Sequence, residues 1–83
     1  MPTIVRRDGF RIKIFGPPRE HPPPHVHVYK GGEGLVIIRL GIRGGPPRVW
    51  SVYDLDGSDV LRAFRLVEAH ASVLQIAWEK IHG

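Results

Sequence analysis

The sequence predicts an α+β domain: a three- to four-stranded, mainly antiparallel sheet with one long C-terminal helix packed on one face. Apolar and polar residues alternate in segments 10–15 and 25–29, which is typical of half-buried strands. Glycine-containing turns separate several of the apolar runs, as between hairpin strands. A stripe of apolar residues at helical spacing follows in the C-terminal third. The 83 residues are expected to form one domain, with the sheet over about 3–54 and the helix over about 58–82.

The first clear strand is segment 10–15. Because side chains alternate along a strand, Ile12 and Ile14 point to one face, whereas Arg11 and Lys13 point to the other. The isoleucine face is therefore expected to be the core face. The opposite face carries two positive charges.

Three further segments are candidate strands, and the first of them is only a possible one. Residues 4–5 could form a short edge strand, and residues 35–40 predict a central strand because they are nearly all apolar and rich in β-branched side chains. The register of this central strand is ambiguous. Residues 48–53 predict the last strand. If the side chains alternate strictly, Val49, Ser51 and Tyr53 point to one face of this strand, and Arg48, Trp50 and Val52 point to the other. The pattern does not tell which of these two faces is buried.

The helix is predicted to begin near Asp56 or Ser58, either of which could accept a backbone N–H bond as the N-cap. A helix of some 24 residues would be ~36 Å long, which is longer than a short strand, so its last turns would overhang the sheet. An overhanging Trp78 would need a partner such as a second chain, and Ala71-Ser72 is where a kink or break is expected. The core face is one stripe: Val60, Phe64, Val67, Ala71, Leu74, Trp78 and Ile81.

The most distinctive segment is 21–28, with the sequence HPPPHVHV. Proline fixes φ at about −65° and restricts the residue before it, so the start of this segment is expected to be extended and to direct the following strand. The two valines of that strand share one face. Its other side chains share the opposite, open face if the valines are core: His25, His27 and Tyr29.

The net charge of +4 is unevenly distributed, because residues 1–30 hold six lysines and arginines against two acidic residues. This excess favours polyanionic partners, either RNA or DNA, and an acidic partner protein is an alternative. Basic groups beside an aromatic ring on an open sheet can contact phosphates and stack bases. The predicted binding surface consists of Arg11, Lys13, His21, His25, His27 and Tyr29.

A divalent metal is a second interpretation of the histidines. The chain has no cysteine, so a metal would have to use histidine, carboxylate and water. His25 and His27 could share a metal, with His21 reaching it from the loop, but a closed site needs a third or fourth ligand, for which Glu20 and His70 are only candidates. The alternative is that the pair is solvated or hydrogen-bonded to the loop, and no other cofactor is expected.

Catalysis and self-association are further alternatives. Two imidazoles with a reference pKa of ~6.5 could act as acid and base in RNA cleavage, with or without metal assistance. Nothing in the sequence fixes a nucleophile or an oxyanion site, so binding is favoured over an enzymatic role. A dimeric adaptor whose helix and Trp78 form the interface, without nucleic-acid contact, is the third interpretation, and a homo-oligomer is expected. No secretory signal or membrane-length apolar run is seen, which favours the cytoplasm.

Four features of the chain occur together: MPTI at its start, GFRI at residues 9–12, the HPPPHVHV segment, and His70 followed by Leu74 and Trp78. Together they resemble a small prokaryotic family called domain of unknown function 4160. The histidine–proline segment is similar to the family pattern H-x-P-P-H-x-H. The resemblance implies no established activity, although its members are suspected toxin–antitoxin components. Val73 and Ile76 stand where members tend to have polar residues, which favours a contact with another chain.

Overall fold

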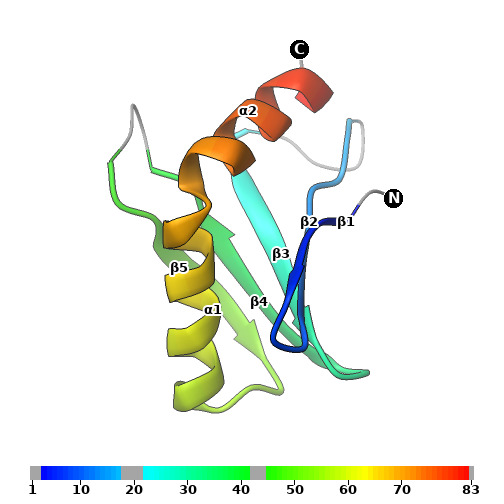
Figure 1. Ribbon diagram of the computed structural model, residues 1–83, viewed down its shortest axis with the longest axis vertical. Helices are drawn as coiled ribbons and strands as arrows, with labels where there is room; N and C mark the ends of the chain where they lie inside the picture. The colour runs from blue at the N-terminus through cyan, green and yellow to red at the C-terminus, as the bar shows by residue number, and fades with distance from the viewer. Residues whose placement is uncertain (1–2, 18–21, 42–44, 83) are drawn as a thin grey trace.

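The computed structural model describes residues 3–17, 22–41 and 45–82. Their elements follow in the order β1 (Thr3–Arg7), β2 (Phe10–Lys13), β3 (His25–Lys30), β4 (Gly34–Arg39), β5 (Arg48–Tyr53), α1 (Gly57–Ala69) and α2 (Ala71–His82). The two helices cover one face of a curved sheet (Figure 1). Neither is long and apolar enough to cross a membrane.

The sheet is a five-stranded meander in which every neighbouring pair of strands is antiparallel. The α+β class and the antiparallel arrangement are therefore confirmed, whereas the predicted strand number of three to four is too low. The fifth strand is β1, for which residues 4–5 were expected only as a possible short edge strand, and it pairs with β2 from Thr3 to Arg7. A tight turn at Asp8 and Gly9 joins them, and both residues have positive φ, at 53° and 83°. A two-residue hairpin with positive φ at both positions matches the twist of its strands.

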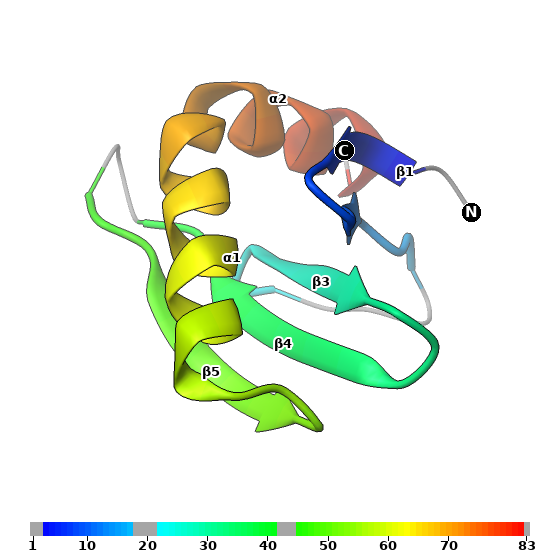
Figure 2. The same ribbon diagram turned by 60° about the horizontal axis from the view of Figure 1, so that its bottom comes forward.

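The single long helix predicted over 58–82 is divided into two helices at His70, which lies one residue before the expected break. The His70 N–H bonds to the carbonyls of Leu66 at 3.2 Å and Val67 at 3.1 Å, and its own φ and ψ of −111° and 16° end the first helix. Figures 1 and 2 show α2 turning from α1 across the end of the sheet. The turn keeps the second helix on the core instead of letting it overhang.

The core lies between the helices and the inward face of the sheet. Asp56 is the N-cap that positions α1, because its Oδ1 accepts a hydrogen bond of 2.8 Å from the Asp59 N–H. The predicted apolar stripe is confirmed in that all seven of its residues are buried or half-buried. Trp78 is only 4% exposed within this single chain, so the expectation that it needs a second chain is wrong. The central core residues are Ile12, Ile14, Val26, Val28, Val36, Ile38, Ala63, Val67, Leu74 and Trp78.

An irregularity in β5 breaks the strict alternation expected of residues 48–53. Ile37 pairs with Ser51, whereas its neighbour Ile38 pairs with Val49, so Trp50 is the extra residue of a bulge. A bulge places two residues opposite one and re-aims a side chain. As a result Val49 and Val52 both lie on the side of the sheet that faces the helices, whereas Ser51 lies on the opposite side. Both valines remain about two-fifths exposed because β5 is an edge strand.

Gly34 offers a sharp test of the packing at the start of β4. A Cβ added there would overlap Leu55 Cδ2 and would lie 2.8 Å from the Lys30 carbonyl oxygen. We expect Gly34→Ala to lower the free energy of unfolding by about 1–3 kcal/mol, measured by urea denaturation, because the crowding includes backbone. Gly32→Ala is the matched control in the same turn, since its Cβ would meet nothing within 4 Å. Equal effects of the two substitutions would contradict this packing.

Candidate functional site

The face of the sheet that points away from the helices carries most of the residues predicted to bind. Residues paired across antiparallel strands share a face. Arg11 of β2 pairs with Tyr29 of β3, and Lys13 of β2 pairs with His27 of β3. The row that begins with Arg11 and Tyr29 continues through Leu35 of β4 to Tyr53 of β5. We call this surface the outer face, which consists of Arg11, Lys13, His25, His27, Tyr29, Leu35, Ile37, Arg39, Arg48, Trp50, Ser51 and Tyr53. His21 and Glu20 lie outside the described residues.

Basic groups and aromatic rings are interleaved on the outer face. Lys13 Nζ lies 5.3 Å from the centroid of the Tyr29 ring, and Arg11 Cζ lies 6.0 Å from it. Arg39 Cζ lies 5.3 Å from the centroid of Trp50. Cations within about 6 Å of a ring are attracted to its face. Arg11 also donates from Nη2 to the Gly31 carbonyl at 2.9 Å, so it supports the β3–β4 turn as well.

The two most exposed rings of the outer face both belong to β5. Trp50 is 50% exposed and Tyr53 is 53% exposed. Sequence reasoning missed this pair, because Trp50 reaches the outer face through the bulge and alternation alone would separate it from Tyr53. It also missed Arg39. Because Arg39 follows Ile38 in the central strand, a buried Ile38 would have placed Arg39 on the opposite, outer face. The outer face therefore extends two strands further than predicted, across β4 and β5.

The histidines lie on the predicted face but are not open to solvent. His25 is 5% exposed and His27 is 9% exposed, so the expectation of open histidines is wrong. Large rings surround them: Trp50 lies 5.5 Å and Trp78 lies 5.2 Å from the His25 ring, centroid to centroid. Phe15, just beyond β2, meets His27 edge-on at 4.9 Å. Alternation predicted the face, but tertiary packing of the rings decides the exposure.

His25 is held by the proline loop. Its Nδ1 lies 2.8 Å from the Pro23 carbonyl, and because a carbonyl only accepts, Nδ1–H is the donor. This is the loop hydrogen bond considered as the alternative to metal binding. The Pro22–Pro23 peptide bond of this loop is cis. The loop thus orients the ring of His25 instead of presenting it to solvent.

His82 extends the cluster to the end of the chain. Its ring stacks on Trp78 at 3.6 Å between centroids, with 16° between the planes. Its Nε2 donates to the Phe15 carbonyl at 2.9 Å. This role could not be predicted from the sequence, because His82 lies beyond the regular stripe near the terminus. The hydrogen bond ties the end of α2 to the segment that follows β2.

A metal site is not completed by the described residues. No group of three or more histidine or acidic side chains suited to a metal occurs within 3–17, 22–41 and 45–82. His70 bonds through Nδ1 to the Leu66 carbonyl at 3.0 Å and lines a cleft beside α1 instead of joining the histidine pair. Metal binding by His25 and His27 stays a prediction.

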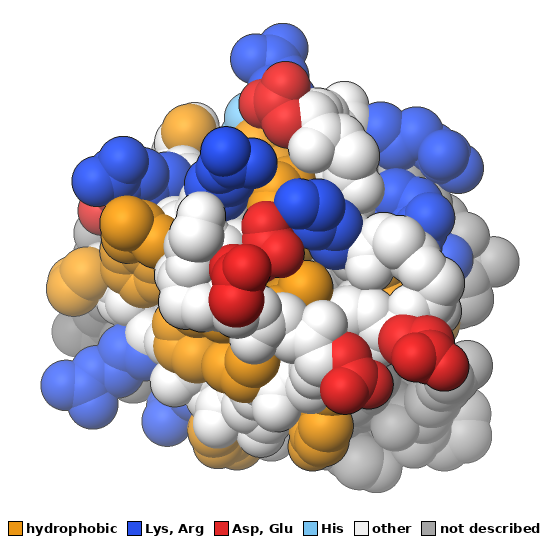
Figure 3. All heavy atoms as spheres, turned by 90° about the horizontal axis from the view of Figure 1, so that it is seen from below, with side chains coloured by type: hydrophobic (Ala, Val, Ile, Leu, Met, Phe, Trp, Pro, Cys, Tyr) orange, Lys and Arg blue, Asp and Glu red, His pale blue; other side chains and the backbone are white. Residues whose placement is uncertain are grey.

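Basic residues also occur away from the outer face. Figure 3 views the molecule from below and shows lysine and arginine side chains distributed around this end, with acidic side chains among them. Net charge alone therefore does not select a binding face. The exposed rings and their adjacent cations distinguish the outer face from the rest.

Comparison with known proteins identifies a family but no activity. A family model described as "Domain of unknown function (DUF4160)" matches residues 9–79. Neither a curated protein nor a solved structure matches the chain.

Proposed function

The chain belongs to the DUF4160 family, and on the evidence of its own residues we propose that its outer face binds single-stranded nucleic acid. The observation that carries this proposal is the pair of half-exposed rings, Trp50 and Tyr53, on one strand beside unburied basic side chains. Aromatic platforms next to cations are the means by which sheet proteins bind single strands.

The exposed rings would supply the base contacts. Trp50 and Tyr53 each present half of their surface to solvent on the same face, so each can accept a stacked base. Such stacking contributes about 1–3 kcal/mol per base and tolerates any sequence. Tyr29 is half-buried, so it offers less ring surface for stacking than Trp50 and Tyr53, and it supports Lys13 and Arg11, which lie beside its ring.

The basic groups would supply the phosphate contacts. Arg48 is exposed and pairs across the sheet with Arg39, which reaches over Trp50. Lys13 lies on the other side of the histidine strand. A strand crossing the sheet would therefore meet cations on both sides of its bases. Within the part of the chain that the structure describes, the one ion pair joins Lys30 to Asp59, so these three cations have no acidic partner and can contact phosphate.

The alternatives fit this geometry less well. A ribonuclease using His25 and His27 needs its imidazoles within hydrogen-bond reach of the ribose and phosphate, but both rings are buried among aromatic side chains. A dimeric adaptor anchored on Trp78 loses its anchor, because that ring packs within its own chain. In a toxin–antitoxin-type pair, as the family resemblance suggests, the outer face would contact nucleic acid and leave the helices for a partner protein.

The test is a salt-dependent titration of labelled single-stranded RNA and DNA. For single strands, log K falls with log salt at about −0.7 per phosphate contact. We expect the triple variant Lys13→Gln, Arg39→Gln, Arg48→Gln to reduce this slope by about 2 and to bind much more weakly at low salt.

Lys80→Gln removes one charge from an exposed position on α2 and is the control. It should change the slope and the affinity little. Absence of binding by the wild type at low salt, or an unchanged slope in the triple variant, would contradict the proposal.

A further inference from the structure

A cleft on the helix side of the molecule is a second candidate site. It lies between the β1–β2 hairpin and α1 and has a volume of about 540 Å³. This volume falls within the range of about 300–1,000 Å³ usual for small-molecule sites. The residues that line this cleft lie on the helix side of the sheet, opposite the outer face. The proposed binding of nucleic acid by the outer face therefore does not explain the cleft.

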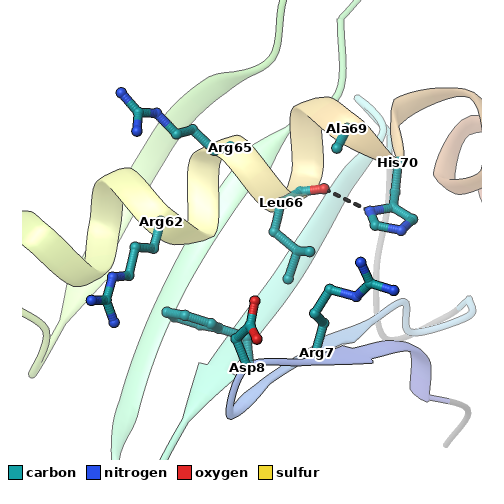
Figure 4. A pocket seen from close by; sticks show the side chains of 8 residues that line it. Arg7, Asp8, Arg62, Arg65, Leu66, Ala69 and His70 are labelled. Atoms are coloured by element: carbon teal, nitrogen blue, oxygen red, sulfur yellow. Dashed lines mark hydrogen bonds between the residues drawn. The ribbon is translucent and has the colours of Figure 1, made fainter.

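The cleft is rich in arginine. Arg7 comes from the hairpin, and Arg62 and Arg65 come from successive turns of α1. Within the described part of the chain, none of the three guanidinium groups has an ion pair or a hydrogen bond. Guanidinium groups bind phosphate and carboxylate through paired N–H donors. Figure 4 shows the Arg65 side chain directed away from the hairpin, which leaves Arg7 and Arg62 as the two guanidinium groups for an anion in the cleft. Two such groups favour an anion with more than one negative charge.

The remaining lining narrows the ligand class. Leu66 is half-buried and supplies apolar surface, which an inorganic ion would leave unused, whereas Phe10 is 2% exposed and offers almost none. Figure 4 shows Asp8 and Arg7 rising from the hairpin toward the helix, with Leu66 descending between them and His70 beside Arg7. The Asp8 carboxylate only accepts hydrogen bonds when ionised. It therefore suits a ligand that carries a hydroxyl or amino group near its apolar part.

We propose that this cleft binds an organic phosphomonoester with a planar, apolar body and a hydrogen-bond donor, as in a nucleoside monophosphate. The phosphate contacts Arg7 and Arg62, and the body rests on Leu66. Asp8 accepts a hydrogen bond from the sugar or base. The same chemistry occurs at the 5′ end of a phosphorylated RNA, so the ligand is either a free nucleotide or such an end.

The test is calorimetric titration of the full chain with adenosine monophosphate, adenosine and inorganic phosphate at low salt. We expect the monophosphate to bind at least about tenfold more tightly than either fragment, because only it uses both the arginines and the apolar surface. Arg7→Gln with Arg62→Gln should weaken it by more than about tenfold. Lys80→Gln, which removes a charge outside the cleft, should change its affinity less than about twofold.

Titrating a short RNA that carries a 5′ phosphate, and the same RNA with a 5′ hydroxyl, distinguishes a free nucleotide from an RNA end as the ligand. Tighter binding of the phosphorylated RNA, lost in the arginine variant, identifies a chain end as the ligand. Binding of the free monophosphate without this difference identifies a nucleotide. The proposal is overturned if the monophosphate binds no more tightly than inorganic phosphate, or if the arginine variant binds it as the wild type does.

Discussion

Replacing Trp78 with alanine is expected to remove a large part of the stability of this domain. The side chain is 4% exposed and packs between His25, at 5.2 Å between ring centroids, and His82, at 3.6 Å. Truncation of a buried tryptophan costs about 3–5 kcal/mol. A domain of 83 residues has a total stability of about 4–12 kcal/mol. We expect the urea midpoint of Trp78→Ala to fall by roughly half.

Val73→Ala is the matched control for this prediction. Val73 lies on the same helix but is 54% exposed, so its truncation should change the free energy of unfolding by less than about 0.5 kcal/mol. Similar midpoints for the two variants would mean that α2 does not pack on the histidine strand as described.

Removing the two exposed rings of the outer face should abolish most nucleic-acid affinity while leaving its salt dependence intact. Trp50→Ala with Tyr53→Ala deletes both stacking platforms and no charge. At about 1–3 kcal/mol per stacked base, we expect an affinity loss of about 100-fold at fixed salt. The slope of log K against log salt should stay that of the wild type. Fluorescence anisotropy with labelled RNA measures both quantities.

Leu61→Ala controls for loss of exposed apolar surface, because Leu61 is 48% exposed on α1. It should bind as the wild type does. An affinity loss confined to the charge variants, with none in the ring variant, would reduce the outer face to a non-specific basic patch. Equal losses in the ring variant and in Leu61→Ala would place binding elsewhere.

Alternation predicted the faces of the central strands well. Ile12, Val26 and Val28 are fully buried, as expected from period-two patterns. Alternation was wrong where the backbone is irregular. Nothing in residues 48–53 marks a bulge at Trp50, because the bulge depends on pairing with β4. The position of a bulge that depends on the neighbouring strand cannot be predicted from the sequence of one strand alone.

Burial of the histidines could not be predicted from their own segment. His25 is covered by Trp50 from β5 and by Trp78 from α2, which are distant in the sequence. The helix stripe predicted that Trp78 would be apolar contact surface, but a straight helix would have carried it past the sheet. The break at His70 brings it back. Long-range contacts therefore decided which site residues are accessible.

Nuclear magnetic resonance can show where nucleic acid binds on this protein, which decides whether the outer face is the binding surface. Isotope-labelled protein is titrated with a short single-stranded oligonucleotide, and the amide and indole resonances are followed. The largest shifts are predicted at the Trp50 indole and along β5 near Tyr53, with little change along the exposed side of α1 around Leu61. Shifts concentrated on the helices, or none at saturating oligonucleotide, would contradict binding by the outer face.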